Sequence, residues 1–237
     1  MVQYPLTIIP TPIGNLEDIT LRGLRMLKEA DLVLAEDTRT TDRLLKEYEI
    51  SVPMKSYHIH NEHSVVKEVA KAVAEGQKVV LVSDAGTPGI SDPGFLLVRE
   101  CLNQGLEVQC LPGATALIPA LVASGLPADR FIFEGFLPHK KGRVGRIEQM
   151  MEREVTTILY ESPKRLLKLL EQMLEVLGDE REVVVAREIS KVYEEYHRGR
   201  PSELMTYFAE NEPKGEIVVL LAPAIKEEKV HKNKYKD

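Results

Sequence analysis

Short apolar runs rich in β-branched residues alternate with segments of helical periodicity along the chain. In the first half, this pattern predicts strands at 6–9, 32–35, 79–82 and 107–111, and helices at 20–30, 39–48, 62–75, 94–104 and 114–124. In the second half, it predicts strands at 131–136, 156–161, 182–188 and 215–222, and helices near 142–153, 163–177 and 201–210. Strands separated by helices favour a mostly parallel sheet, and the second alternation implies a second α/β layer.

The segment 112–130 is the best place for a domain boundary. Its helix, PGATALIPALVASGLP, is flanked by proline and glycine on both sides and can bridge two sheets. We therefore predict an N-terminal α/β domain over 1–113, a C-terminal α/β domain over 114–225 and a flexible tail over 226–237. No GxGxxG follows a strand and no GxxxxGK[ST] occurs, so neither a dinucleotide-binding Rossmann site nor a P-loop is expected.

Composition narrows the class of protein further. With 237 residues and 43% hydrophobic content, the chain can bury a sizeable core, which excludes a disordered or fibrous protein. The formal charge of -6 does not favour a protein that coats nucleic acid, so any RNA contact must rest on a local basic segment. Two cysteines without a CxxC pair fit a reducing cytoplasm. The absence of a basic leader and of a run of about 18 apolar residues predicts a cytoplasmic protein without a membrane span.

Four loops that follow strands hold most of the unusual residues. They are 10–15 (PTPIGN), 36–39 (EDTR), 57–62 (YHIHNE) and the loop within VVLVSDAGTPGISDPG, 79–94. Because ligands of open parallel sheets bind beyond the carboxyl ends of the strands, we expect all four loops at one edge, around a small, partly polar ligand. The alternative is that the last stretch is only a tight turn, with Asp92 capping a helix and Pro93 at its first position.

These motifs, taken together, resemble one family. TPIGNLEDIT, LAEDTRTT, SDAGTPGISDPG and PGATALIPALVASGLP, followed by EGFLP, YESP and AREISK, are similar to the tetrapyrrole-methylase superfamily over residues 5–222. The match is best to the branch that 2′-O-methylates a decoding-centre cytidine of 16S rRNA in the small ribosomal subunit. This resemblance implies a class III methyltransferase. Such a protein is a homodimer of two-domain α/β chains that bind S-adenosylmethionine in an interdomain cleft rather than in a Rossmann pocket.

The resemblance also implies which residues contact S-adenosylmethionine. They come from the first loop, the SDAGTP stretch, the bridging helix and the second domain: Pro12, Asp84, Ala85, Gly86, Pro88, Ser91, Thr115, Ala116, Tyr160 and Ala186. Of these, Tyr160 and Ala186 would close over the nucleoside. The corrin and porphyrin branch usually has a GGDP-like loop where this chain reads SDAGTP, which disfavours a tetrapyrrole substrate.

Transfer of a methyl group to a ribose hydroxyl requires alignment of the acceptor oxygen and removal of its proton, but no metal. The hydroxyl pKa is far above 7, so a base or a positive group should lie near it. The candidates on the EDTR, HNE and AREISK segments are Asp37, Arg39, His60, Glu62, Glu188 and Lys191, with Glu36, Asn61 and Arg187 beside them. The residues alone do not select among these.

For some of these candidate residues, a purely structural role is an alternative to a role in catalysis. Asp37 and Thr38 could simply cap the following helix, and Arg187 with Glu188 could form a structural ion pair. The histidines of HIHNEH, His58, His60 and His63, do not have a standard zinc spacing, so a loop at the substrate edge is preferred over a metal site.

The segment PHKKGRVGR, 138–146, concentrates Lys140, Lys141, Arg143 and Arg146 and predicts a mobile phosphate clamp for 16S rRNA. Its alternative is a solvated loop and helix start. Two other functions also fit the motifs. One is methylation of a corrinoid precursor or another small acceptor by the same fold. The other is a ribosome-assembly protein that binds the cofactor without turnover.

Overall fold

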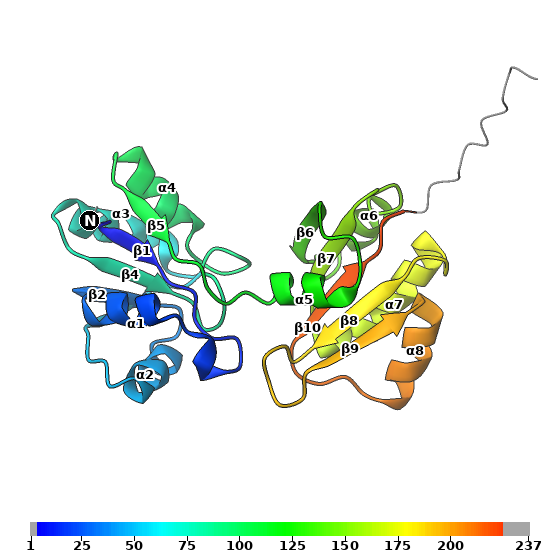
Figure 1. Ribbon diagram of the computed structural model, residues 1–237. Helices are drawn as coiled ribbons and strands as arrows, with labels where there is room; N and C mark the ends of the chain where they lie inside the picture. The colour runs from blue at the N-terminus through cyan, green and yellow to red at the C-terminus, as the bar shows by residue number, and fades with distance from the viewer. Residues whose placement is uncertain (1–3, 225–237) are drawn as a thin grey trace, which may run out of the picture. The chain divides into compact units, whose positions relative to one another are not determined.

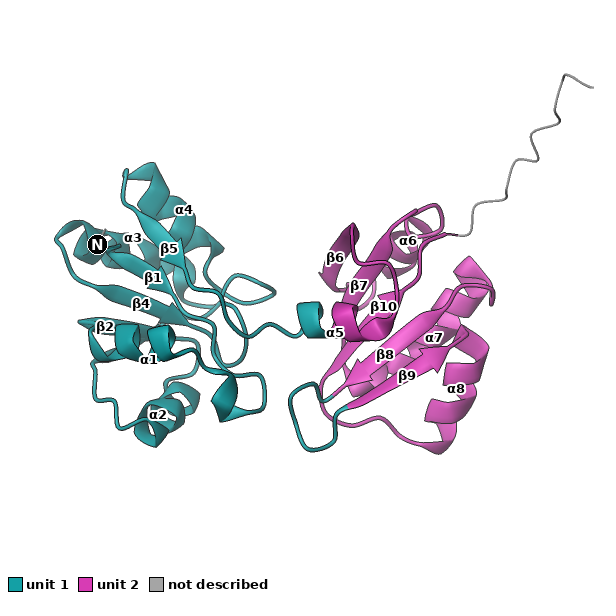
Figure 2. Ribbon diagram, viewed as in Figure 1, with its two compact units in different colours: residues 1–119, 188–194 teal, residues 120–187, 195–237 magenta. Residues whose placement is uncertain are grey.

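The computed structural model describes residues 4–224. Their packing divides into two compact units, which Figure 2 colours separately. Among the described residues, unit 1 comprises 4–119 with 188–194, and unit 2 comprises 120–187 with 195–224. The division falls within the bridging helix, later than the boundary at 113, and the predicted tail over 226–237 lies outside the described residues.

Unit 1 is built on a five-stranded sheet. Its strands are β1 (Leu6–Ile8), β2 (Leu32–Ala35), β3 (Met54–Ser56), β4 (Val79–Val82) and β5 (Val108–Cys110), in the order β3-β2-β4-β1-β5 (Figure 1). The helical segments are η1 (Leu16–Asp18), α1 (Leu21–Lys28), α2 (Thr38–Glu47), α3 (Glu62–Ala74) and α4 (Phe95–Asn103). All neighbouring strands pair in parallel, so the loops after them open onto one edge.

Helices cover both faces of this sheet because its strands are apolar on both sides. Along β4, Val79 and Leu81 pack with α3 and α4, whereas Val80 and Val82 pack with α1 and α2. All four side chains are buried. A continuous run of aliphatic residues is typical of a parallel strand between two helical layers.

Unit 2 contains a mixed sheet. Its strands are β6 (Phe131–Phe136), β7 (Thr156–Glu161), β8 (Val183–Arg187), β9 (Glu195–Gly199) and β10 (Ile217–Leu221), in the order β6-β7-β10-β8-β9. Only β6 and β7 pair in parallel; the other pairs are antiparallel. The helices α6 (Arg143–Glu148), α7 (Pro163–Leu177) and α8 (Pro201–Glu210) pack on one face, and α5 (Leu117–Ser124) spans the division between the units.

The structure confirms the expected fold class, which is two α/β layers in an arrangement distinct from the dinucleotide-binding Rossmann fold. Strands β3 and β9 carry few β-branched or strongly apolar residues, and their positions are only partly buried, so the hydrophobic pattern did not predict them. Helix α6 ends at Glu148, earlier than the predicted 153. Within residues 4–224, no helix combines the length and the apolar character that crossing a membrane requires.

Candidate functional site

Three loops at the carboxyl edge of the unit 1 sheet are tied to one another. Thr11 and Gly86 exchange two backbone hydrogen bonds of 2.9 Å, which join the loop after β1 to the loop after β4. The Thr87 hydroxyl donates to the Ala114 carbonyl oxygen at 3.0 Å, which adds the loop after β5. The predicted cofactor residues of unit 1 all lie on these loops: Pro12, Asp84, Ala85, Gly86, Pro88, Ser91, Thr115 and Ala116.

Two glycines allow this close arrangement. Gly86 has a φ of 83°, in the left-handed region that favours glycine. At Gly113, a Cβ would lie 2.7 Å from Cβ of Pro10, so any side chain would push the loops after β1 and β5 apart. The edge therefore keeps its backbone open to a ligand that approaches closely.

Carboxylates gather at the same edge. The backbone N–H of Asp37 donates to Oδ1 of Asp84 at 3.0 Å, and the N–H of Asp84 donates to Oε2 of Glu36 at 3.4 Å. Burial raises the pKa of Glu36 and of Asp84, and it raises the pKa of Asp92 to about 7, with the charge of Glu36 acting in the same direction. A concentration of negative charge of this kind favours a cationic ligand such as a sulfonium.

Asp92 does not cap the following helix, contrary to the simple turn interpretation. Helix α4 begins at Phe95, and its N-cap is Gly94, with a φ of 146°. The proximity of Asp92 to Ser83 and Glu36 shows that the SDAGTPGISDPG loop folds back toward the strand end. This arrangement was not visible in the sequence, where Pro93 next to Asp92 looked like a helix start.

Asp37 is the N-cap of α2, as the structural alternative proposed. Its Oδ1 accepts from the backbone N–H of Arg39 at 2.9 Å, and its carboxylate also binds the Arg39 guanidinium, with a shortest contact of 2.6 Å. These interactions lower the pKa of Asp37 to about 2. Asp37 is therefore a poor proton acceptor near neutral pH, and its action on Arg39 is to hold that side chain in place.

The HNE turn is organised by Asn61. Its amide oxygen accepts from the backbone N–H of His58 at 2.8 Å, and its amide nitrogen donates to the Ser56 carbonyl at 3.0 Å. His60 is exposed, and Glu62 is the first residue of α3. His58, by contrast, is close enough to Glu36 to lower the pKa of that carboxyl, against the effect of burial. Thus His58, rather than His60, lies near the carboxylates. Residues 4–224 contain no group of three or more histidine, cysteine or acidic side chains placed to hold a metal ion.

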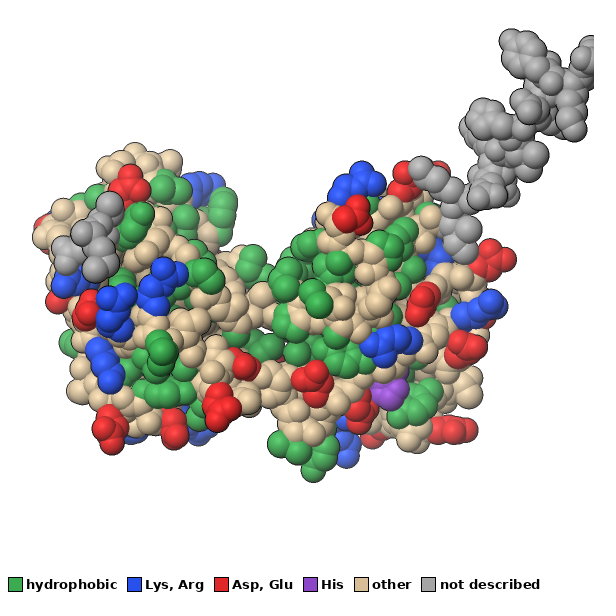
Figure 3. Space-filling view, viewed as in Figure 1, with side chains coloured by type: hydrophobic (Ala, Val, Ile, Leu, Met, Phe, Trp, Pro, Cys, Tyr) green, Lys and Arg blue, Asp and Glu red, His purple; other side chains and the backbone are tan. Residues whose placement is uncertain are grey.

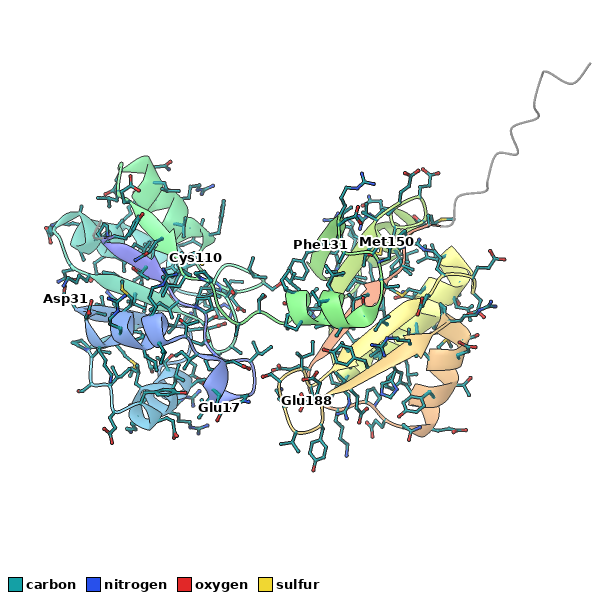
Figure 4. All side chains as sticks on the ribbon, viewed as in Figure 1. Glu17, Asp31, Cys110, Phe131, Met150 and Glu188 are labelled. Atoms are coloured by element: carbon teal, nitrogen blue, oxygen red, sulfur yellow. The ribbon has the colours of Figure 1, made fainter. Side chains whose placement is uncertain are left out.

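The loop 188–194 follows β8 and packs as part of unit 1; Figure 4 labels Glu188 at its start. Lys191 Nζ contacts Oε1 of Glu188 at 2.7 Å, and Arg187 pairs with Glu195 at 2.8 Å. The two candidates Glu188 and Lys191 are thus brought together, and the ion pair anticipated between Arg187 and Glu188 is replaced by these two. Glu188 has a φ of 54°, which is uncommon for a residue with a side chain.

The predicted cofactor residues of unit 2 lie on two strands. Tyr160, on β7, packs edge to face against Phe133 and Phe136, with ring centroids 4.9 Å and 5.6 Å away. Ala186, on β8, is fully buried. Val218 of β10 lies between the two positions, and a sheet face with an aromatic ring and small aliphatic residues suits a flat, partly apolar group such as a nucleoside.

The basic segment divides into exposed and buried residues. Lys140, Lys141 and Arg146 are exposed, although Arg146 Nη1 lies 3.7 Å from Glu134. Arg143 is only 3% exposed, and its guanidinium binds Glu161 at 2.7 Å. Helix α6 begins at this position and turns the side chain into unit 2, so Arg143 is not exposed for the RNA contact predicted for it. On the face shown in Figure 3, charges of both signs are interspersed.

Unit 1 also has a pocket of about 300 Å³ that the sequence did not predict. It lies between the loops after β1 and β4 and one face of α2, and its lining residues are Thr11, Pro12, Leu16, Thr40, Thr41, Arg43, Leu44, Glu47, Ser83 and Asp84. Thr40, Leu44 and Glu47 have the i, i+4, i+7 spacing of a single helix face. That periodicity is visible in the sequence, but it does not show that a loop lies opposite.

The fold and the edge of the sheet define a methyltransferase of the class that the motifs indicated. The family model described as tetrapyrrole (corrin/porphyrin) methylases matches residues 5–205, and the chain belongs to this family. Methyltransferases of this family take the methyl group from S-adenosylmethionine.

The particular relatives are ribosomal RNA enzymes. The chain is 48% identical over 217 residues to ribosomal RNA small subunit methyltransferase I of Thermotoga maritima, a match that covers 92% of this chain and 97% of that protein. It is 47% identical over 222 residues to the protein of the same name from Escherichia coli O157:H7, covering 92% of this chain and 78% of that protein.

Solved structures share the fold at much lower identity. The methyltransferase CobJ matches with a TM-score of 0.69 at 19% identity, covering 94% of this chain and 95% of that chain. Diphthine synthase matches with a TM-score of 0.69 at 15% identity, covering 92% of this chain and 89% of that chain. Differently named enzymes thus have this architecture, so the fold alone does not identify the acceptor.

Proposed function

We propose that this protein transfers the methyl group of S-adenosylmethionine to the 2′-oxygen of a decoding-centre cytidine in 16S rRNA of the small ribosomal subunit. The observation that carries the proposal is identity of 46–48% over at least 91% of the chain to relatives named ribosomal RNA small subunit methyltransferase I. The SDAGTP loop supports it, because the chain departs there from the corrin and porphyrin pattern.

The unit 1 loops fit the cofactor. S-adenosylmethionine supplies an electrophilic methyl group on a sulfonium cation, and the carboxylates of Glu36, Asp84 and Asp92 favour such a cation at the loop edge. Gly86 lets backbone approach the ligand closely, and Tyr160 and Ala186 of unit 2 would contact the nucleoside.

Acceptor chemistry needs a proton acceptor and a positive group. Among the carboxylates of the edge, Asp37 is held ionised with a pKa of about 2, whereas burial raises the pKa of Asp92 to about 7 and also raises that of Glu36. A carboxyl with a pKa near 7 is the better general base at neutral pH. We therefore assign proton removal to Asp92, with Glu36 near it, and stabilisation of the developing alkoxide to Arg39, which Asp37 orients.

The deciding experiment uses small ribosomal subunits from a strain that lacks this gene. The purified protein and radiolabelled S-adenosylmethionine should label 16S rRNA at one cytidine, and the labelled position should resist alkaline cleavage because its 2′-oxygen is methylated. A corrinoid precursor offered in parallel should remain unlabelled. Labelling of the corrinoid but not of the subunits would favour the alternative acceptor, and cofactor binding without any transfer would favour an assembly protein.

We propose further that the enzyme acts in the cytoplasm as a homodimer, as its family resemblance implies. Light scattering coupled to gel filtration should give twice the 26.7 kDa mass of the chain. A mass of one chain under conditions of full activity would exclude a required dimer.

A further inference from the structure

The pocket beside α2 has an unusual set of polar groups. The Thr11 hydroxyl donates a hydrogen bond to the Ser83 carbonyl oxygen at 3.0 Å. The Ser83 hydroxyl in turn contacts the carbonyl oxygens of Ala85 and Gly86. These hydroxyls are therefore occupied within the loops. The groups that remain for a ligand are those of α2, namely Thr40, Thr41, Arg43 and Glu47, together with Asp84.

Arg43 and Glu47 are one helical turn apart on the pocket wall and carry opposite charges, yet they do not form an ion pair with each other. On the same helix, Asp42 and Lys46 have the same spacing and do pair, at 2.6 Å. Within residues 4–224, neither Arg43 nor Glu47 has any other side-chain ion pair or hydrogen bond. The pocket therefore presents a guanidinium donor and a carboxylate acceptor side by side, both available to a ligand.

A third polar group of the wall also lacks a partner. Thr41 is 2% exposed, and its hydroxyl oxygen has no hydrogen-bond partner within the described part of the chain. Leaving a buried polar group unpaired costs about 1–3 kcal/mol, so such groups are uncommon in native proteins. The apolar part of the wall comes from Pro12, Leu44 and Leu16, and Leu16 is 44% exposed.

The pocket adjoins the predicted cofactor residues without coinciding with them. Of the ten residues assigned to S-adenosylmethionine, only Pro12 and Asp84 line it, and its far wall is α2. An acceptor oxygen must lie about 3–3.5 Å from the methyl group that it attacks. A site that shares two residues with the cofactor loops is therefore well placed for the acceptor nucleoside.

We propose that this pocket binds the base of the acceptor nucleotide and selects cytosine, an inference that rests on the proposed function. A volume of about 300 Å³ is at the lower end of the range of about 300–1,000 Å³ for ligand pockets, which suits a single nucleoside. Glu47 would accept from the 4-amino group of cytosine, and Arg43 would donate to O2, an acceptor that uracil also has. Leu16 and Pro12 would contact the faces of the ring.

Uracil reverses the hydrogen-bonding pattern that Glu47 would read. It presents the O4 acceptor where cytosine has its amino donor, so the carboxylate would face a lone pair. A good pair of this kind discriminates by about 1–3 kcal/mol, which corresponds to about fivefold to 150-fold. A glutamine at position 47 can donate as well as accept, so Glu47→Gln should bind either base.

The test compares reconstituted small subunits that carry cytidine or uridine at the methylated position. Under single-turnover conditions at saturating S-adenosylmethionine, we expect the wild-type protein to prefer cytidine over uridine. In Glu47→Gln this preference should fall by at least about fivefold. Arg43→Gln should slow transfer to cytidine and weaken subunit binding measured with S-adenosylhomocysteine. Lys46→Gln and Glu49→Gln are matched controls outside the pocket, and they should behave as wild type.

Two results would overturn the inference while the proposed function stands. In the first, the wild-type protein methylates cytidine, and Arg43→Gln and Glu47→Gln have the same rate and the same preference for cytidine over uridine as the wild type. The second is a loss of S-adenosylmethionine affinity in these variants, because Arg43 and Glu47 could instead bind the carboxylate and the amino group at the methionine end of the cofactor. Absence of transfer from the wild-type protein to any small subunit would overturn the proposed function, and the inference with it.

Discussion

Tyr160 on β7 and Ala186 on β8 both pair with Val218 of the intervening strand β10, so the two residues flank Val218 in one row across the unit 2 sheet. Side chains at paired positions of neighbouring strands lie on the same face of a sheet. The row continues to Phe136 on β6 and to Tyr196 on β9. Two residues 26 positions apart in the sequence thus belong to one surface, which aromatic side chains border at both ends.

We expect Tyr160→Ala to weaken S-adenosylmethionine binding. Loss of an aromatic ring that stacks on a base costs about 1–3 kcal/mol, so calorimetric titration should show at least a fivefold increase in Kd. The matched control is Tyr207→Ala on α8, because Tyr207 also packs in an aromatic cluster, with His197 at 4.5 Å, but lies outside the row. Equal, small effects of the two substitutions would remove Tyr160 from the cofactor site.

A second prediction concerns the backbone of the SDAGTP loop. Gly86 and Gly76 both have a positive φ, of 83° and 93°, but only Gly86 lies at the loop edge. Each substitution by alanine should lower the free energy of unfolding by about 1–2 kcal/mol, the cost of a left-handed conformation with a Cβ. A Cβ at Gly86 would lie 3.5 Å from Cγ2 of Ile13, so the folded loop can accommodate it.

The two glycine variants should therefore differ in binding and not in stability. Gly86→Ala should weaken S-adenosylmethionine binding, because the new methyl group projects where the ligand approaches, whereas Gly76→Ala should bind normally. Titration calorimetry and urea denaturation measure the two quantities. Normal cofactor affinity in a folded Gly86→Ala variant would contradict the placement of the cofactor at this loop.

The parts of the site that could be predicted from sequence are those fixed by local chain direction. Parallel strands place every following loop at one edge, so the proximity of the loops carrying Pro12 and Gly86 follows once the strands are identified. The cap formed by Asp37 is equally local, because it depends on three consecutive residues. In both cases the pattern along the chain contains the geometry.

The parts that could not be predicted depend on tertiary packing. Arg143 follows two exposed lysines and looks like a surface cation, but the start of α6 turns it toward Glu161, 18 residues away. The pocket requires α2 to lie against the loop that carries Ser83, and no pattern along either segment shows this. Asp92 does not form the helix cap that was the alternative interpretation of this loop, and instead lies near Glu36 and Ser83, a contact that only the folded loop creates.

Asp92 should make stability depend on pH. Burial raises its pKa to about 7, and the charges of Glu36 and Asp84 act in the same direction. An unfolded aspartate has a pKa of about 3.9, so the folded state binds more protons between about pH 4 and pH 7. Stability should therefore fall as pH rises through this window.

Asp92→Asn should remove this pH-dependent loss. We expect a gain in the free energy of unfolding on the order of 1 kcal/mol at about pH 8 relative to wild type, and little difference at about pH 4. Urea denaturation across this range measures it, and Asp129→Asn at an exposed site is the control. Wild-type and Asp92→Asn proteins with parallel pH profiles would show that the carboxyl is not perturbed.

The basic segment should separate into two effects. Replacing Lys140, Lys141 and Arg146 by glutamine should weaken binding of small subunits and reduce the slope of log K against log salt by about 2–3. Replacing Lys164, Lys168 and Lys214, which are exposed cations elsewhere on unit 2, is the control for net charge. An unchanged salt slope in the first variant would identify the segment as ordinary solvated surface.

Arg143 should behave differently from its neighbours in the same measurements. Arg143→Gln leaves Glu161 buried, although Arg165 still contacts it at 2.7 Å. We expect a loss of about 3 kcal/mol in the free energy of unfolding, at the lower end of the range of about 3–5 kcal/mol for a broken buried pair. The salt slope of subunit binding should not change.

The last prediction concerns turnover at the acceptor side. Arg39 is held by Asp37 and its guanidinium is exposed at the loop edge, with 86% of the side chain accessible. Arg39→Ala should lower the single-turnover rate at saturating S-adenosylmethionine without changing cofactor affinity, because a group that stabilises a developing alkoxide acts in the transition state. Asp37→Asn should also slow transfer, since it frees Arg39, but asparagine caps helices as well as aspartate does, so α2 should remain stable.

Glu188→Gln should likewise lower the rate of transfer more than the affinity for S-adenosylmethionine if the loop 188–194 serves the acceptor. Small subunits methylated at near-normal rates by all three variants would place the acceptor chemistry elsewhere, and the pocket wall formed by Arg43 and Glu47 would then be the next site to test.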